Sequence, residues 1–82
     1  MFDIIFTAEA RKSLKKINKD AQQRIISSLE RCRIRPHSFV KKLVGSPYFR
    51  FRIGDYRVII NILSKKLIIL VIEVGHRKNI YK

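Results

Sequence analysis

Residues 48–60 read Tyr-Phe-Arg-Phe-Arg-Ile-Gly-Asp-Tyr-Arg-Val-Ile-Ile, and this stretch decides the fold. Aromatic and β-branched residues flank Gly54-Asp55, a pair that suits a two-residue type II′ turn between two antiparallel strands. Such a turn places Arg52 opposite Arg57. Opposed residues share a face of a sheet, and so do residues two apart on one strand. We therefore expect two opposite faces, one carrying Arg50, Arg52 and Arg57 and the other carrying Phe49, Phe51, Val58 and Ile60.

A third strand is expected at residues 67–74, and the preceding loop sets its register. A three-residue loop at 64–66 pairs Leu63 with Leu67 and Arg57 with Glu73. A two-residue loop would instead place the Glu73 carboxylate in the core, where it is costly, so we predict the longer loop. This register aligns Gly75 and Arg77 with the arginine face. It also leaves an apolar surface there, of the kind that marks an interface, formed by Ile59, Leu63, Leu67, Ile69 and Val71.

The N-terminal half predicts one short strand and two helices. Apolar residues alternate along residues 2–6 at the period of a strand. Thr7 is expected to cap the first helix, and Asp20 with Gln23 has the spacing of a capping box for the second. The two helices should pack as an antiparallel hairpin. Their inner faces are expected to consist of Ala10, Leu14 and Ile17, followed by Ile25, Ile26, Leu29 and Cys32.

Pro36 and Pro47 bound the long irregular stretch of the chain, residues 36–47. The second helix must end before Pro36. The expected fold class is therefore α+β, in the order β-α-α-β-β-β, with an antiparallel meander sheet and a helical hairpin packed on one of its faces. A chain of 82 residues is expected to form a single domain, 1–82.

The composition indicates a folded protein with a polyanionic partner. Nineteen Lys and Arg against six Asp and Glu give a net charge of +13, while a hydrophobic content of 46% excludes a disordered basic tail. The single cysteine, Cys32, excludes an internal disulfide and a cysteine-based zinc site. The longest apolar run, residues 67–72, is too short to cross a bilayer, and Asp3 interrupts the N-terminal apolar stretch. We expect a cytoplasmic protein that binds nucleic acid or the ribosome and does not bind membranes.

The segment 48–59 and the tail Val74-Gly-His-Arg-Lys-Asn-Ile-Tyr81 together resemble the RelE/ParE superfamily of toxins, in its RelE-like branch. The resemblance covers essentially the whole chain. It implies a RelE-like fold and the toxin of a type II toxin–antitoxin module, which cleaves messenger RNA in the ribosomal A site. It also implies an acidic antitoxin, partly disordered before binding, that neutralises the toxin in a hetero-oligomer.

The resemblance assigns roles to residues of this chain. Members of this kind use no metal or cofactor, and the 2′-OH of the RNA attacks the adjacent phosphate, so the substrate must be RNA. Arg57 and Arg77 match arginines that contact the phosphate, and Tyr81 matches a tyrosine at the scissile site. Lys78, Arg50 and Arg52 are expected to bind RNA.

One departure concerns the general base. Lysines stand in the well-characterised relatives where this chain has Arg50 and Arg52, and arginine does not give up its proton in a protein. His76 is then the candidate base, because imidazole titrates near neutral pH. Two alternatives remain open: a ParE-like poison of DNA gyrase without catalytic activity, and an inactive basic RNA-binding domain.

Overall fold

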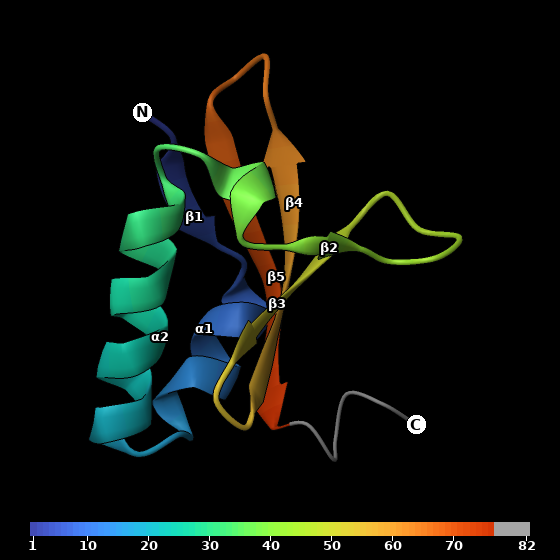
Figure 1. The fold of residues 1–82 in the computed structure, drawn as a ribbon. Coiled ribbons are helices and arrows are strands. Elements are labelled where there is room, and N and C mark those ends of the chain that lie inside the picture. Colours follow the sequence, from blue (N-terminus) through green and yellow to red (C-terminus); the bar gives the residue numbers. More distant parts are fainter. Residues whose placement is uncertain (77–82) are drawn as a thin grey trace.

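The computed structural model describes residues 1–76, so Arg77, Lys78 and Tyr81 lie outside the described residues. Figure 1 shows the elements in chain order. They are β1 (Asp3–Phe6), α1 (Ala8–Lys15), α2 (Lys19–Cys32), the 3-10 turn η1 (Pro36–Ser38), β2 (Lys41–Lys42), β3 (Phe49–Ile53), β4 (Tyr56–Leu63) and β5 (Ile68–His76).

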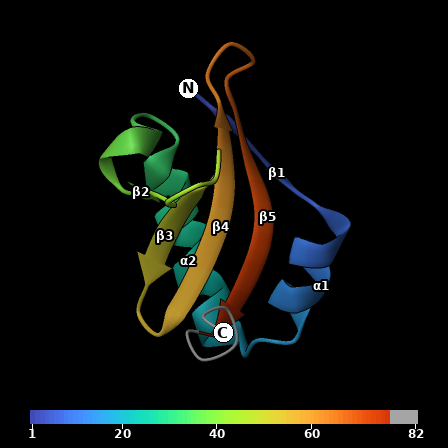
Figure 2. The same cartoon turned by 90° about the vertical axis from the view of Figure 1, so that its right-hand side faces the viewer.

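The strands form one sheet in the order β1-β5-β4-β3-β2. Strand β1 runs parallel to β5, and the other neighbours are antiparallel. Both helices cover the same face, with α1 against β5 and β1 and α2 against β3 (Figure 1). Figure 2 is turned toward the opposite face, which we call the outer face. The α+β class and the helical layer are confirmed, but the sheet is mixed and five-stranded and extends the predicted meander by a parallel β1 and a short β2.

Side-chain caps begin both helices. The Thr7 Oγ1 accepts the Ala10 N–H at 3.1 Å, as predicted. The second cap differs from the prediction, because Asn18 accepts the Ala21 N–H at 2.9 Å and Asp20 lies inside the first helical turn. An aspartate there still interacts favourably with the helix N-terminus. The inner face of α2 is formed by Ile25, Leu29 and Cys32, whereas Ile26 is 38% exposed.

The hairpin of β3 and β4 has the predicted register. Gly54 has a φ of +57°, which a type II′ turn requires at its first central position. Arg52 stands opposite Arg57, and Phe51 opposite Val58. Phe51 and Val58 belong to the core under the helices, so the arginines of this hairpin point to the outer face.

The hairpin of β4 and β5 differs from the prediction in two ways, and each shifts the pairing by one residue in the same direction. Its turn has four residues, Ser64–Leu67, so Leu63 pairs with Ile68. A bulge then adds Ile72 to β5 opposite the Ile59–Ile60 step, so Arg57 pairs with Gly75 and not with Glu73. Glu73 is nevertheless exposed on the outer face, opposite Ile59.

The shifted register also corrects the expected apolar surface. Ile69 and Val71 are fully buried in the core and do not lie on the arginine face. Leu67 belongs to the turn and is 49% exposed. The apolar residues on the outer face of β4 and β5 are Ile59, Leu63, Ile68 and Leu70.

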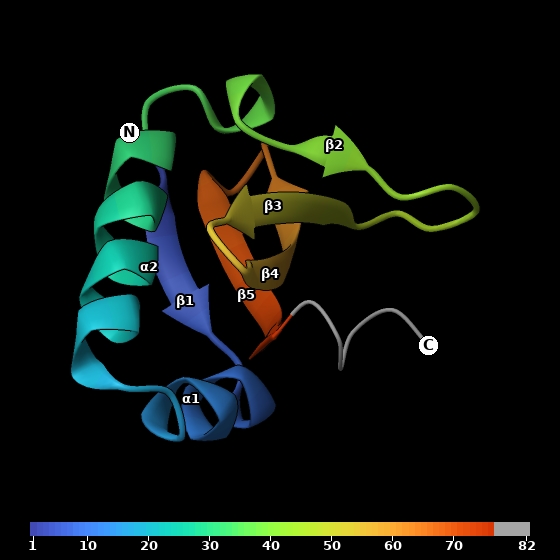
Figure 3. The ribbon, with the colours of Figure 1, turned by 60° about the horizontal axis from the view of Figure 1, so that its bottom comes forward.

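Strand β2 lies within residues 36–47, which were predicted to be irregular. Its two residues pair with β3, Lys41 opposite Arg50 and Lys42 opposite Phe49. Figure 3 shows the chain between β2 and β3 extending away from the helices. Among residues 1–76, no helix has the length and apolar character needed to cross a membrane.

Candidate nucleic-acid interface

Four cations form a row on the outer face, and we call Lys41, Arg50, Arg52 and Arg57 the basic row. Two cross-strand pairs build it: Lys41 opposite Arg50, and Arg52 opposite Arg57. Arg50 and Arg52 are two residues apart on β3, so both pairs lie on the same face. Like charges directly opposed destabilise a sheet, and the row contains two such pairs. A group of cations on one face is chemically suited to bind an anionic ligand such as a phosphate.

The members of the basic row differ in burial, and the one on the central strand β4 is the most buried. Lys41 and Arg52 are exposed, Arg50 is partly buried, and Arg57 is only 2% exposed. Arg57 stands opposite Gly75, which carries no side chain that could compete for space at that cross-strand position. A buried guanidinium has few alternative rotamers. Arg57 is therefore the preorganised member of the row, and the outer members can adapt to a ligand.

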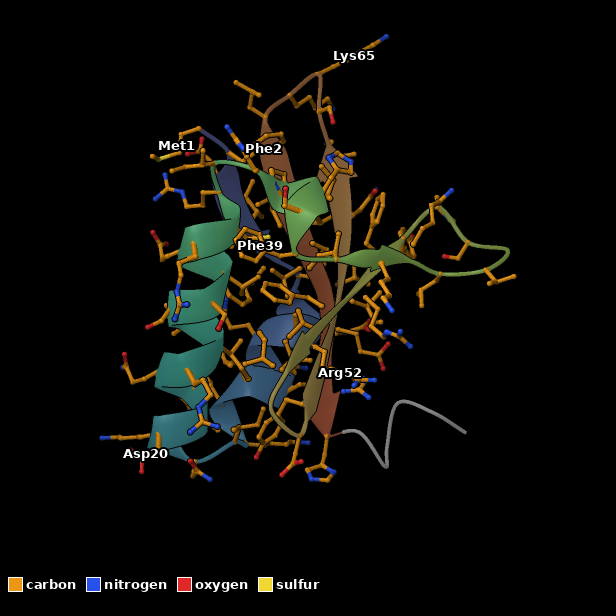
Figure 4. The ribbon with its side chains drawn as sticks, viewed as in Figure 1. Met1, Phe2, Asp20, Phe39, Arg52 and Lys65 are labelled. Carbon is orange, nitrogen blue, oxygen red and sulfur yellow. The ribbon has the colours of Figure 1, made fainter. Side chains whose placement is uncertain are left out.

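A hollow lies beside the outer end of the basic row. It has a volume of about 220 Å³ and is lined by Phe39, Lys41, Arg50 and Arg52. Phe39 is 46% exposed, and its ring lies 6.2 Å from the ring of Phe51 in the core. Figure 4 labels Phe39 and Arg52 on the two sides of β3. The hollow thus combines one exposed aromatic ring with three cations.

His76 lies on the other face of the sheet from Arg57. It ends β5 and pairs with Tyr56, whose neighbour two residues on, Val58, is in the core. The rings of His76 and Tyr56 meet edge to face at 5.5 Å. A second hollow of about 540 Å³, lined in part by Ser13 and Lys16 of α1, also adjoins His76. The described residues therefore bring Arg50, Arg52 and Arg57 together and leave the candidate base on the opposite side.

Two other titratable side chains lie apart from the basic row. His37 packs edge to face on Phe49 at 5.4 Å. Cys32 is fully buried, its Sγ donates to the Pro36 carbonyl at 3.6 Å, and burial raises the pKa of its thiol to about 11. Within residues 1–76, no three His, Cys, Asp or Glu side chains come together as a metal site.

Sequence reasoning did not identify Lys41 or Phe39 as members of the site. Lys41 joins the arginines only through β2, and a strand of two residues leaves no periodic signal. The available hint was the pair Lys41-Lys42 inside a Pro-bounded segment that precedes an arginine-rich strand.

Comparisons with known proteins agree with this fold and charge pattern. A family model described as the ParE toxin of the type II toxin–antitoxin system parDE matches residues 4–81. An Escherichia coli protein described as RelE-like toxin is 29% identical over 80 residues, covering 94% of this chain and 84% of that protein.

Solved structures of RelE toxins share the fold. A chain of the RelB–RelE antitoxin–toxin complex from Methanococcus jannaschii is 28% identical with a TM-score of 0.75, and 95% of each chain is covered. A chain of the RelE–RelB complex from Pyrococcus horikoshii is 25% identical with a TM-score of 0.79, covering 93% of this chain and 94% of that one. The E. coli RelBE complex matches with a TM-score of 0.81 at 21% identity, covering 93% and 96%. Since the family model spans nearly the whole sequence, the chain belongs to the ParE toxin family of type II toxin–antitoxin systems and has the fold of the RelE toxins.

Proposed function

We propose that this toxin is a ribosome-dependent endoribonuclease that cleaves messenger RNA in the A site and so inhibits translation in the cytoplasm. The single domain 1–82 would carry the whole activity, without a metal ion or cofactor. The observation that carries this proposal is the basic row, with Arg57 buried at the centre of the sheet and two exposed cations beside it. A preorganised guanidinium suits a phosphate whose charge increases in the transition state.

The proposed reaction is an intramolecular attack by the RNA. The 2′-oxygen loses its proton and bonds to the adjacent phosphorus, the 5′-oxygen of the next nucleotide leaves with a proton, and a 2′,3′-cyclic phosphate remains. Arg57 and Arg77 would stabilise the phosphorane-like charge, and Tyr81 would stack on a base or transfer a proton. Arg50, Arg52 and Lys78 would bind the RNA.

The general base is the open part of this mechanism. Guanidinium groups do not act as bases at neutral pH, so the basic row cannot deprotonate the 2′-OH. His76 would have to reach the RNA around the end of β5, because its side chain lies on the face away from Arg57. The ribosome would compensate for few protein acids and bases by holding the RNA in line, an orientation effect worth several kcal/mol.

We also propose an antitoxin partner for this chain. The M. jannaschii and P. horikoshii relatives were solved as antitoxin–toxin complexes. The outer face joins a basic row to the apolar residues of β4 and β5, which an acidic segment that folds on binding would complement in both charge and apolar area.

A second candidate function is poisoning of DNA gyrase by binding alone. The matching family model is that of ParE toxins, and the fold does not separate the two activities. The third reading, an inactive RNA-binding domain, predicts neither toxicity nor cleavage.

The deciding experiment is expression without antitoxin, with messenger RNA ends mapped and plasmid supercoiling followed in the same cells. We expect new ends at A-site codons, unchanged supercoiling, and ribosome-dependent cleavage in vitro that EDTA does not affect. Arg77→Ala should lower the cleavage rate by roughly 10²–10³-fold, because it removes a donor to the developing charge. Lys65→Ala, which removes a cation from the exposed turn between β4 and β5, is the control and should stay toxic. Loss of supercoiling with intact messenger RNA, and a fully toxic Arg77→Ala, would establish the gyrase reading instead.

A further inference from the structure

We propose that the hollow at the β3 edge is a binding subsite for one nucleotide of single-stranded RNA next to the scissile phosphate. Phe39 would stack on the base, and Lys41 would hold the flanking phosphate beside Arg50 and Arg52. This inference deepens the proposed function and rests on it for the position of the scissile phosphate. Neither Phe39 nor Lys41 belongs to the residues assigned above to the reaction.

The first argument is the geometry of the basic row. Arg57 marks the buried centre, and the row then continues through Arg52 and Arg50 to Lys41 on β2. Residues two apart on a strand lie roughly 7 Å from each other, a step that successive phosphates of an extended strand can follow. Lys41 lies two strands across from Arg57, at about 4.8 Å per strand, and two residues further along. If Arg57 holds the reacting phosphate, Lys41 is therefore placed for another phosphate of the same strand, within about two such steps.

The second argument is the exposed ring of Phe39. Phe51 supports the Phe39 ring at a ring distance of 6.2 Å, while 46% of Phe39 stays exposed and can contact a ligand. It lines the same hollow as Lys41, Arg50 and Arg52. An aromatic platform beside a positively charged track is the arrangement that binds single-stranded nucleic acid with little sequence preference.

RNA fits this hollow better than an acidic peptide. At about 220 Å³, the hollow offers one exposed ring and three cations. A stacked base with its phosphates uses both kinds of group at once. A peptide carboxylate would use the cations and leave the ring without a partner.

The test is fluorescence anisotropy with a labelled 2′-O-methyl oligoribonucleotide, which cannot be cleaved by 2′-OH attack and needs no ribosome. We expect Phe39→Ala to weaken binding about tenfold, since stacking contributes about 1–3 kcal/mol per base, and Phe39→Tyr to bind normally. Lys41→Gln should lower the slope of log affinity against log salt by about 0.7, the value for one phosphate contact. Lys65→Gln, the matched control in the turn between β4 and β5 (Figure 4), should leave the slope unchanged.

Several outcomes would overturn the subsite. The first is that Lys41→Gln and Lys65→Gln change the salt slope equally, and the second is that Phe39→Ala binds the oligonucleotide as tightly as the wild type. The third is that the wild type has no affinity for the oligonucleotide. The fourth is that Phe39→Ala and Lys41→Gln weaken the binding of an acidic peptide and leave RNA binding unchanged. Thermal unfolding of Phe39→Ala tests its fold, and Lys41→Gln tests the subsite independently of that ring. The anisotropy measurement does not depend on cleavage, which the expression experiment above measures separately. If the wild type binds RNA through Phe39 and Lys41 but does not cut messenger RNA, only the proposed nuclease activity is contradicted. If the wild type cuts messenger RNA but binds the oligonucleotide without help from Phe39 and Lys41, only the subsite is contradicted.

Discussion

At the scale of single residues, Arg57 is a charged side chain that the fold buries to 2% exposure. Its position opposite Gly75 follows from the four-residue turn and the bulge at Ile72 together, which place Glu73 opposite Ile59. Ile59 lies two residues along β4 from Arg57, so Glu73 and Arg57 share the outer face without being cross-strand partners. The register therefore keeps the carboxylate on the same face but displaced from the buried arginine.

Cys32 is the residue whose titration the structure predicts. Its thiol is fully buried, donates to the Pro36 carbonyl, and has a pKa raised to about 11 by burial, so folding favours the protonated form. The stabilisation is complete below the ordinary thiol pKa of 9.0 and is lost as the pH rises toward 11. We expect the difference in unfolding free energy between wild type and Cys32→Ala to shrink by about 2 kcal/mol across that window.

Urea unfolding at pH 8, 9.5 and 11 measures this difference. The alanine variant lacks the thiol but has the same lysines and tyrosines as the wild type, so the titration of those groups cancels in the comparison. Parallel pH profiles for the two proteins would mean that the Cys32 thiolate is not penalised in the fold.

At the scale of elements, Thr7 links two of them at once. Its Oγ1 accepts the Ala10 N–H at the start of α1 and donates to the carbonyl of Ile72, the bulge residue of β5, at 3.1 Å. The Thr7 N–H also donates to the Val71 carbonyl at 3.0 Å. One side chain therefore begins a helix and satisfies the carbonyl that the bulge turns out of the ladder.

We expect Thr7→Val to lower the unfolding free energy by about 1–2 kcal/mol, because it keeps the shape and removes both hydrogen bonds. Thr7→Ser keeps the hydroxyl and should stay within about 0.5 kcal/mol of the wild type. Urea denaturation of the two variants checks this, and equal stabilities would show that the hydroxyl does not hold the bulge.

The two hairpins show what the sequence could predict. Gly54-Asp55 is a strong local turn signal, so it predicted the register of β3 and β4 and with it the common face of the three arginines. The segment 64–67 has no glycine, and its turn places Leu67 at a φ of +54°, a conformation that leucine rarely adopts. The extra turn residue and the bulge depend on tertiary packing, because α1 and β1 pack against β5. Local sequence patterns therefore predicted the correct face of the sheet for Glu73, but they predicted Arg57 as its cross-strand partner where the structure has Ile59.

At the scale of the whole molecule, charged residues lie on both sides of the sheet. Three acidic residues, Glu9, Asp20 and Glu30, lie on the helices. Glu30 also pairs with Arg33 at 2.9 Å, near the N-terminal strand. The basic row lies on the face away from those helices (Figure 2). The same two helices carry six basic residues, Arg11, Lys12, Lys15, Lys19, Arg24 and Arg31. Positive charge therefore lies on both sides of the sheet, and the basic row is its cluster on the outer face.

This distribution predicts how steeply RNA binding depends on salt. If all four members of the basic row contact phosphates, the slope of log affinity against log salt should be about −3 for a single strand, or about a fiftyfold loss between 50 and 200 mM. The double variant Lys41→Gln/Arg52→Gln removes its two exposed members and should reduce the slope to about −1.4. Lys65→Gln/Lys66→Gln removes the same charge from the turn between β4 and β5 and should keep the wild-type slope. Anisotropy titrations at four salt concentrations measure all three slopes. A common reduction in both double variants would mean that RNA responds to net charge alone, and the basic row would then have no special part in binding.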